Sequence, residues 1–229
     1  MRLDKLLSNL KYGSRKEVKA LIKDEAILVN GVVCKDSDKR IDPNHDTILI
    51  NGEPVFYKEN LIVAIHKPKG YLSANKDLKY PTVFQLLSET YQRVDLKMAG
   101  RLDLDTSGLM ILTTSGTIVH KLSNPNQHVD KIYEATLNQP LTEEAKIKLL
   151  SGVTLIDVDG SSYEAKAKEL NYDQHIATIT IDQGRFHQVK KMFQAVDYQV
   201  LELKRITYGK LKLNLEEGDF KEVLLSEII

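Results

Sequence analysis

Residues 100–114 join a polar, turn-rich stretch directly to an apolar run. The polar part holds Arg101 and two acids, Asp103 and Asp105, and residues 109–113 have the composition of a buried strand. A chain with this segment has to place a carboxylate at the mouth of a strand that lies inside a sheet. A carboxylate held there is a candidate nucleophile or base.

The two acids of this segment differ in their local sequence. Asp105 is followed by Thr106-Ser107-Gly108, and Asp and Thr side chains bond backbone amides in turns while glycine tolerates positive φ. Asp105 is therefore predicted to cap a turn, whereas Asp103 has no such local role and is the stronger catalytic candidate. Aspartic-protease chemistry needs two carboxylates that share a proton, and the chain has no second matching segment.

Residues 1–57 predict a small module with the order helix, helix, hairpin, strand. Leucines recur at helical spacing over residues 3–10. Ser14 and Glu17 have the spacing of a capping box at the start of a second helix. An Asn30-Gly31 pair between two apolar runs is a strong hairpin signal.

Residues 58–61 are predicted to be a linker, and residues 62–229 to form a second unit. Its helical patterns are too few and too irregularly placed for a repeated βαβ chain, so an α+β fold with a mainly antiparallel or mixed sheet is expected. The predicted strands are residues 109–113, 133–137, 177–181 and 200–203, and the predicted helices are residues 81–90, 143–150 and 188–196.

Basic residues gather in two places although the formal net charge is zero. Residues 1–23 hold seven bases and two acids, and residues 183–212 again hold seven bases and two acids. Charge alone leaves two interpretations open for the first cluster, a solvated helix face or a surface for phosphates. One cluster in each unit favours an extended polyanion that binds across both. His187, in the second cluster, is predicted to be structural or to contact RNA.

The sequence does not indicate a disulfide-bonded, metal-binding, membrane-spanning or secreted protein. Cys34 is the single cysteine, which excludes an internal disulfide, and no His/Cys cluster has the spacing of metal ligands. No apolar run approaches membrane-spanning length, and no apolar signal core follows the charged N-terminus. A cytoplasmic protein that binds no membrane and needs no metal is expected.

Six short motifs follow one another behind the N-terminal module. They are Ile65-His66-Lys67-Pro68-Lys69-Gly70-Tyr71, Pro81-Thr82-Val83, Gly100-Arg101-Leu102-Asp103, Lys131-Ile132-Tyr133, Gly184-Arg185-Phe186-His187-Gln188-Val189-Lys190 and Leu203-Lys204-Arg205. In this order they resemble the RsuA family of pseudouridine synthases, which isomerise uridine in ribosomal RNA. Residues 1–57 are similar to the S4 RNA-binding module. The resemblance covers nearly the whole chain. It implies a catalytic domain with a mixed, largely antiparallel sheet and a catalytic cleft across the middle of that sheet.

The resemblance also implies roles for single residues. Asp103 matches the catalytic aspartate, Tyr133 the tyrosine that packs on the target base, and Lys190 the basic residue that pairs with the aspartate. Arg101 matches an arginine that helps to displace the target nucleotide. The other expected RNA contacts are Arg185, His187, Lys191 and Arg205 in the second unit and Arg2, Arg15, Lys16 and Lys19 in the first.

The expected substrate is a uridine of 16S ribosomal RNA, met in a pre-ribosomal small-subunit particle by a monomer that uses no cofactor. His66, Gln183 and Thr114-Ser115-Gly116 depart from the family's usual residues and concern substrate contacts. Two alternatives stay open: a non-catalytic S4-containing factor for rRNA binding or ribosome assembly, and a synthase for large-subunit rRNA. A methyltransferase is disfavoured because no glycine-rich cofactor loop follows an early strand.

Overall fold

The computed structural model describes residues 1–124 and 127–229 and divides into two compact units. The first unit contains Met1–Leu61 together with Leu87–Lys97, and the second contains Ile62–Leu86 and Met98–Ile229. The sequence did not indicate that residues 87–97 belong with the N-terminal module. No helix among the described residues is both long and apolar enough to cross a membrane.

The first unit contains three helices and a small sheet. Its helices are α1 (Leu3–Asn9), α2 (Arg15–Lys23) and α3 (Glu89–Arg93). Its strands are β1 (Ile27–Val29), β2 (Val32–Val33), β3 (Ile48–Ile50) and β4 (Glu53–Pro54), in the order β2-β1-β3-β4.

Local signals in the sequence explain how α2 and the β1–β2 hairpin begin and end. The Glu17 amide donates to Ser14 Oγ at 3.3 Å and the Ser14 amide donates to Glu17 Oε2 at 2.7 Å, which confirms the predicted capping box. Asn30 and Gly31 both have positive φ, as a two-residue type I′ hairpin requires. Residues 87–97 join this unit through long-range contacts: Lys11 Nζ donates to Gln92 O at 2.6 Å.

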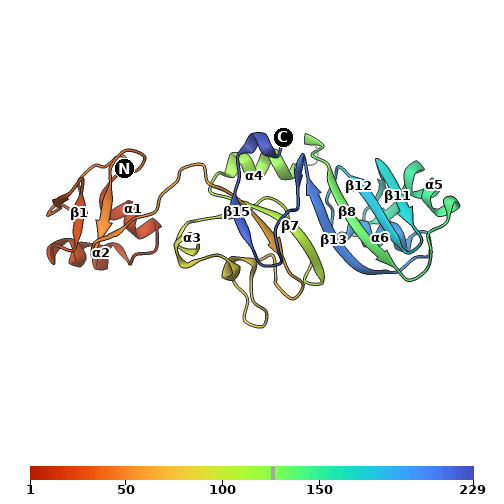
Figure 1. Cartoon of the computed structure of the whole chain (residues 1–229), viewed down its shortest axis with the longest axis horizontal. Helices are drawn as coiled ribbons and strands as arrows, with labels where there is room; N and C mark the ends of the chain where they lie inside the picture. The colour runs from red at the N-terminus through yellow and green to blue at the C-terminus, as the bar shows by residue number, and fades with distance from the viewer. Residues whose placement is uncertain (125–126) are drawn as a thin grey trace. The chain divides into compact units, whose positions relative to one another are not determined.

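The second unit is built on one mixed sheet with strand order β11-β12-β8-β13-β7-β5-β15 (Figure 1). The strands are β5 (Ile62–Lys67), β7 (Thr106–Thr113), β8 (Lys131–Leu137), β11 (Glu169–Asp173), β12 (Ile176–Ile181), β13 (Val200–Tyr208) and β15 (Phe220–Glu222), with β6 (Lys97–Met98) beside β7 and β14 (Leu211–Lys212) beside β13. Along this path β13 and β7 run parallel and all other neighbours run antiparallel. The predicted mixed, largely antiparallel sheet is thus confirmed.

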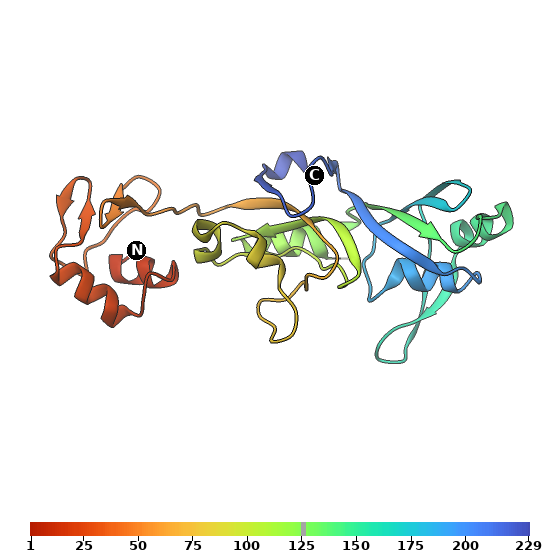
Figure 2. The same ribbon diagram turned by 60° about the horizontal axis from the view of Figure 1, so that its bottom comes forward.

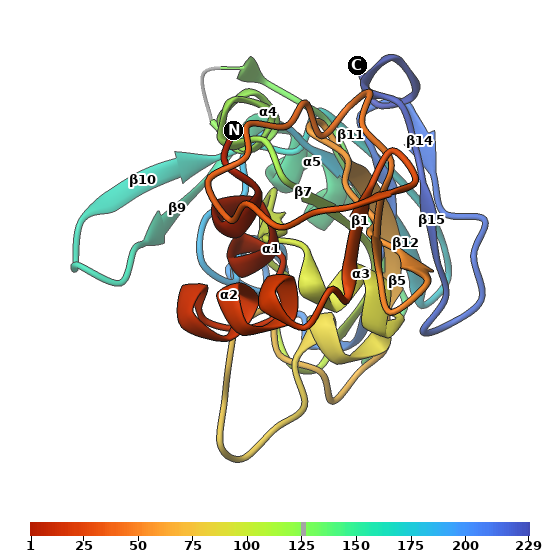
Figure 3. The same ribbon diagram turned by 90° about the vertical axis from the view of Figure 1, so that its left-hand side faces the viewer.

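Helices and one separate hairpin complete the second unit. The helices are α4 (Gly116–Ser123), α5 (Glu143–Ser151) and α6 (Gln188–Gln194), with 3₁₀ turns at Val83–Leu86 and Leu225–Glu227. Helix α6 packs against β13 and β9 (Figure 2). Strands β9 (Val153–Ile156) and β10 (Ser162–Ala165) form a two-stranded sheet that projects from the rest of this unit (Figure 3).

Two predicted elements are wrong in detail. The predicted helix over residues 81–90 is a 3₁₀ turn at Val83–Leu86 followed by the separate α3. The predicted turn over residues 105–108 is shorter, because β7 already begins at Thr106. Pairing of Thr106 with Leu203 and of Gly108 with Arg205 draws these turn-forming residues into the sheet. The local preference of the segment is therefore overridden by pairing with β13.

Gly108 allows β7 and β13 to approach each other closely. Its φ is +118°, and a Cβ atom at this position would lie 2.4 Å from both the backbone nitrogen and the backbone oxygen of Arg205. Backbone atoms inside a sheet cannot move aside as a flexible side chain can. Only glycine fits here.

We expect Gly108→Ala to lower the free energy of unfolding by more than about 2 kcal/mol, because the new methyl group forces the two strands apart. Urea unfolding followed by circular dichroism measures the change. Gly116→Ala is the matched control: its Cβ would meet no atom within 4 Å and its φ is not positive. A Gly108→Ala protein as stable as this control would contradict the steric argument.

Candidate active site

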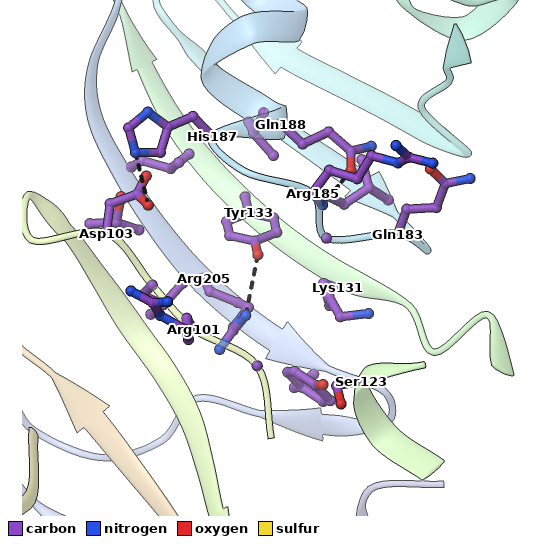
Figure 4. A pocket seen from close by; sticks show the side chains of 18 of the residues that line it. Arg101, Asp103, Ser123, Lys131, Tyr133, Gln183, Arg185, His187, Gln188 and Arg205 are labelled. Atoms are coloured by element: carbon purple, nitrogen blue, oxygen red, sulfur yellow. Dashed lines mark hydrogen bonds and ion pairs between the residues drawn. The ribbon is translucent and has the colours of Figure 1, made fainter. Parts of the chain in front are cut away.

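A pocket of about 130 Å³ lies over the central strands of the second unit. Its lining comes from the segment before β7, from β8 and β13, and from the loop between β12 and α6 (Figure 4). The titratable side chains around it include Arg101, Asp103, Lys131, Tyr133, Arg185 and Arg205. Residues far apart in sequence therefore meet over the middle of the sheet.

Asp103 is held at the entrance to β7 by the backbone on either side of it. Ser73 Oγ donates to Leu102 O at 2.6 Å and accepts from the Leu102 amide at 3.1 Å. The Thr106 amide donates to Asp103 O at 3.2 Å. The side chain of Asp103 is 28% exposed, so its carboxylate can reach a ligand while the backbone beneath it stays fixed.

Lys190 on α6 and His187, the residue before that helix, flank the Asp103 carboxylate. Lys190 Nζ lies 3.1 Å from Oδ2, and His187 Nε2 lies 3.3 Å from Oδ1. His187 is the residue before α6 and has a left-handed backbone with φ of 54°, which turns its ring toward Asp103 (Figure 4). Each carboxylate oxygen thus has its own neighbour. The contact of His187 with Asp103 was not predicted from the sequence.

Asp105 bonds its own backbone amide, as a residue of a turn can, and also contacts a residue far along the chain. Its side chain is 73% exposed and accepts a bond from Lys190 Nζ at 2.6 Å, while the turn is closed by the backbone bond from Thr106 to Asp103. Partial burial acts to raise the pKa of Asp105, but the hydrogen bond and charge of Lys190 outweigh it and lower that pKa. Lys190 is therefore shared between two carboxylates.

Tyr133 and Arg205 form the floor of the pocket. They are directly opposite each other in the β8–β13 register, and Arg205 Nη1 donates to Tyr133 Oη at 3.3 Å (Figure 4). Arg205 is only 1% exposed, and its Nε donates to Leu109 O at 2.7 Å. A contact of Arg205 with RNA would have to be made with a group inside the pocket.

Lys131 was not predicted as a site residue, although it stands two residues before Tyr133 and so on the same face of β8. Its Nζ donates to Val129 O at 2.7 Å and lies 5.3 Å from the ring centroid of Tyr208. Burial lowers the pKa of Lys131 to about 8, and the charge of Arg205 acts in the same direction. Alternation along a strand beside a candidate tyrosine was the available signal.

The other predicted RNA contacts of the second unit lie at its surface. Arg101 is exposed and lines the pocket. Arg185 Nη1 lies 2.7 Å from Asp157 Oδ2, and its guanidinium stacks 4.3 Å from the ring centroid of Tyr163. Lys191 Nζ donates to Ile156 O at 2.7 Å. Arg185 and Lys191 therefore both contact the β9–β10 hairpin and the loop at its tip.

The predicted contacts of the first unit divide into two groups. Arg2 is ion-paired with the buried Asp4 and with Asp38. Its guanidinium thus has a structural partner, and its contact with RNA stays a prediction. Arg15, Lys16 and Lys19 are exposed on α2. Among the described residues, no group of three or more His, Cys, Asp or Glu is placed to hold a metal ion.

Comparison with protein families matches two parts of the chain. Residues 61–195 match the family described as RNA pseudouridylate synthase, and residues 1–47 match the S4 domain. The chain is also similar over its full length to a solved structure described as a pseudouridylate synthase, with 32% identity, 98% of that chain covered and a TM-score of 0.67.

Three relatives are similar over nearly their full lengths. An uncharacterized RNA pseudouridine synthase of Bacillus subtilis is 39% identical, with all of this chain and 97% of the relative covered. Ribosomal small subunit pseudouridine synthase A of Pasteurella multocida is 32% identical, with coverage of 100% and 98%. Ribosomal large subunit pseudouridine synthase B of Bacillus subtilis is 34% identical, with coverage of 99% and 93%.

The low pKa of Lys131 predicts a specific dependence of stability on pH. Between pH 8 and 10.5 the lysine is protonated in the unfolded chain and largely neutral in the folded one, so deprotonation favours folding. Relative to Lys131→Met, the wild-type free energy of unfolding should rise by up to about 3 kcal/mol across this window.

Urea titrations at several pH values measure this difference. Lys35→Met is the matched control, because Lys35 is exposed and the hydrogen bond with Glu25 raises its pKa in the folded state, so its deprotonation does not favour folding. A constant difference between wild type and Lys131→Met from pH 7 to 10.5 would show that Lys131 is not desolvated.

Proposed function

Because the chain belongs to the RNA pseudouridylate synthase family, we propose that it converts one uridine of 16S ribosomal RNA to pseudouridine, with Asp103 as the nucleophile. The observation that carries this proposal is the placement of the Asp103 carboxylate beside Lys190, at a pocket whose floor is Tyr133. A carboxylate, a cation and an aromatic ring that can stack on a base are the groups that the reaction requires.

The proposed reaction begins with a uridine that leaves its stack and enters the pocket. Leaving the stack costs a few kcal/mol. Stacking of the base on Tyr133 and contacts from Arg101 to the RNA backbone would offset this cost. Asp103 then attacks either C1′ of the ribose or C6 of the base as the anion. Lys190 Nζ, 3.1 Å from Asp103 Oδ2, pairs with the carboxylate and holds it in place.

The remaining steps rearrange the nucleotide without adding or removing atoms. The N1–C1′ bond breaks and its electron pair leaves with the base. The base turns and C5 bonds to C1′. The bond that Asp103 made to C1′ or C6 breaks and its electron pair returns to the carboxylate, the C5 proton is lost and N1 gains a proton. We propose that Tyr133 stacks on the base and takes part in the proton transfer. Because the product is an isomer of the substrate, the reaction needs no redox partner.

The S4 domain would supply affinity for the ribosomal RNA. Arg15, Lys16 and Lys19 project from one short helix and are exposed, so they can contact successive phosphates. We propose that the protein acts as a cytoplasmic monomer on a pre-ribosomal small-subunit particle. The relative named for the small subunit supports this choice, whereas the relative named for the large subunit supports the alternative target.

Asp103→Asn should abolish pseudouridine formation while RNA binding stays within about twofold of wild type, because the amide keeps the shape but cannot act as the nucleophile. Single-turnover assays on 16S rRNA transcripts or assembly particles measure the first quantity, and filter binding measures the second. Asp105→Asn is the matched control, since it removes the other carboxylate of Lys190 and leaves Asp103 in place. Turnover at the wild-type rate in Asp103→Asn would refute the assignment.

Deleting the gene and mapping pseudouridines in both ribosomal RNAs tests the target. We expect one site in the small-subunit RNA to disappear and to return with the wild-type gene but not with Asp103→Asn. Loss of a site in the large-subunit RNA would select the alternative synthase. An unchanged map would favour the non-catalytic assembly factor.

A further inference from the structure

The pocket contains two buried cations that the steps above do not use. Lys131 on β8 and Arg205 on β13 both line it and both lie against the ring of Tyr208, at 5.3 Å and 4.9 Å from its centroid. Tyr208 is itself buried and donates its hydroxyl to Leu122 O at 2.8 Å. Figure 4 shows Lys131 and Asp103 on opposite sides of Tyr133.

The hydrogen bonds of these two cations are incomplete among the described residues. Arg205 Nη2 is buried and has no hydrogen-bond partner there, whereas Nε and Nη1 donate to Leu109 O and Tyr133 Oη. Lys131 Nζ, which has three donors, is bonded to Val129 O. Burying a cation while one of its N–H donors has no acceptor costs free energy, unless a bound ligand supplies that acceptor.

No carboxylate within the pocket wall is ion-paired with Lys131 or Arg205 among the described residues. Asp182 is bonded to His128 at 2.8 Å and Asp130 to Lys168 at 2.6 Å, so the nearest acids have other partners. Lys190 and His187, in contrast, flank Asp103 directly. The pocket thus has a carboxylate directly flanked by Lys190 and His187 on one side. On the other side it has two cations without a directly paired acid among the described residues, although Asp182 and Asp130 act on Lys131 at longer range.

We propose that Lys131 and Arg205 form a base-anion site, which binds the carbonyl oxygens of the uracil ring and stabilises the negative charge that the detached base carries. The inference rests on the proposed function and adds the residues that assist bond cleavage. When the N1–C1′ bond breaks, its electron pair stays on the base and spreads over N1 and the two carbonyl oxygens. Donors fixed in a water-poor pocket stabilise such a charge strongly.

The base-anion site also accounts for the turn of the base. A cation that binds the carbonyl oxygens can hold the uracil ring throughout the reaction. N1 then separates from C1′, and C5 becomes the ring atom bonded to C1′. The charge returns to the new C5–C1′ bond, and the site is then occupied by a neutral base again. Tyr133 Oη, bonded to Arg205, lies within the same set of donors.

The first experiment varies the leaving group. Lys131→Met should slow glycosidic cleavage by about 10²-fold in single-turnover reactions on the rRNA substrate, and Lys131→Arg should retain most of the rate. With the same RNA carrying 5-fluorouridine, whose base is a more stable anion, the loss in Lys131→Met should be several-fold smaller, measured as disappearance of the fluorouridine nucleoside.

Lys67→Met is the matched control. Lys67 is also buried, donates to the Pro68 and Tyr71 carbonyls at 2.9 Å, and has a pKa that burial lowers to about 8, but it does not line the pocket. Any loss of rate in this variant should be equal for uridine and 5-fluorouridine. An equal loss for both substrates in Lys131→Met would overturn the inference and leave the proposed function intact.

The second experiment needs no turnover. Barbiturate, a pyrimidine that is an anion at neutral pH, should bind the full-length wild-type protein at least about tenfold more tightly than neutral uracil in calorimetric titrations. Lys131→Met and Arg205→Lys should lose this preference. Equal binding of both pyrimidines to wild type would refute the base-anion site. Absence of pseudouridine formation by wild type, with the preference retained, would refute the proposed reaction alone.

Discussion

The close approach of β7 and β13 is the constraint on which the site depends. Because Gly108 has no Cβ atom, the backbone of Arg205 can lie close to it. The Arg205 side chain donates hydrogen bonds to Leu109 O on β7 and Tyr133 Oη on β8. One residue thus connects three neighbouring strands. Because the Asp103 turn leads directly into β7, the same approach sets where its carboxylate lies relative to Tyr133. A shift of one residue in this register would point Tyr133 to the other face of the sheet.

Charge is organised locally in this protein, since its formal net charge is zero. Lys190 lies between Asp103 and Asp105, so its charge is divided between a partly buried carboxylate and an exposed one. Arg185 is likewise paired with Asp157. The pocket wall formed by Lys131 and Arg205 is different, because no acid is paired with either cation among the described residues. The cation paired with Asp103 therefore supports that carboxylate, whereas the cations without a paired acid are available to bind a ligand.

The sequence predicted those features that depend on local chemistry or on motifs. The Ser14–Glu17 capping box and the Asn30-Gly31 hairpin follow from short-range hydrogen bonding and backbone preference, and both are confirmed. The motif order led to the family and to a mixed, largely antiparallel sheet, which are also confirmed. The proximity of Asp103 and Lys190, 87 residues apart in the chain, was expected only through the resemblance. The catalytic roles of these residues stay predictions.

Features that depend on tertiary contacts could not be predicted from the sequence. Asp105 has the neighbours of a turn cap and bonds its own amide, and its carboxylate also accepts a hydrogen bond from Lys190 of α6. Arg205 belongs to a basic cluster, yet its position on a central strand buries it. In both cases residues far along the chain add a contact or an environment that the local sequence did not indicate. Burial of Arg205 changes its chemistry most, because a surface arginine is hydrated whereas an enclosed one with a free donor can act strongly on a charge that forms beside it.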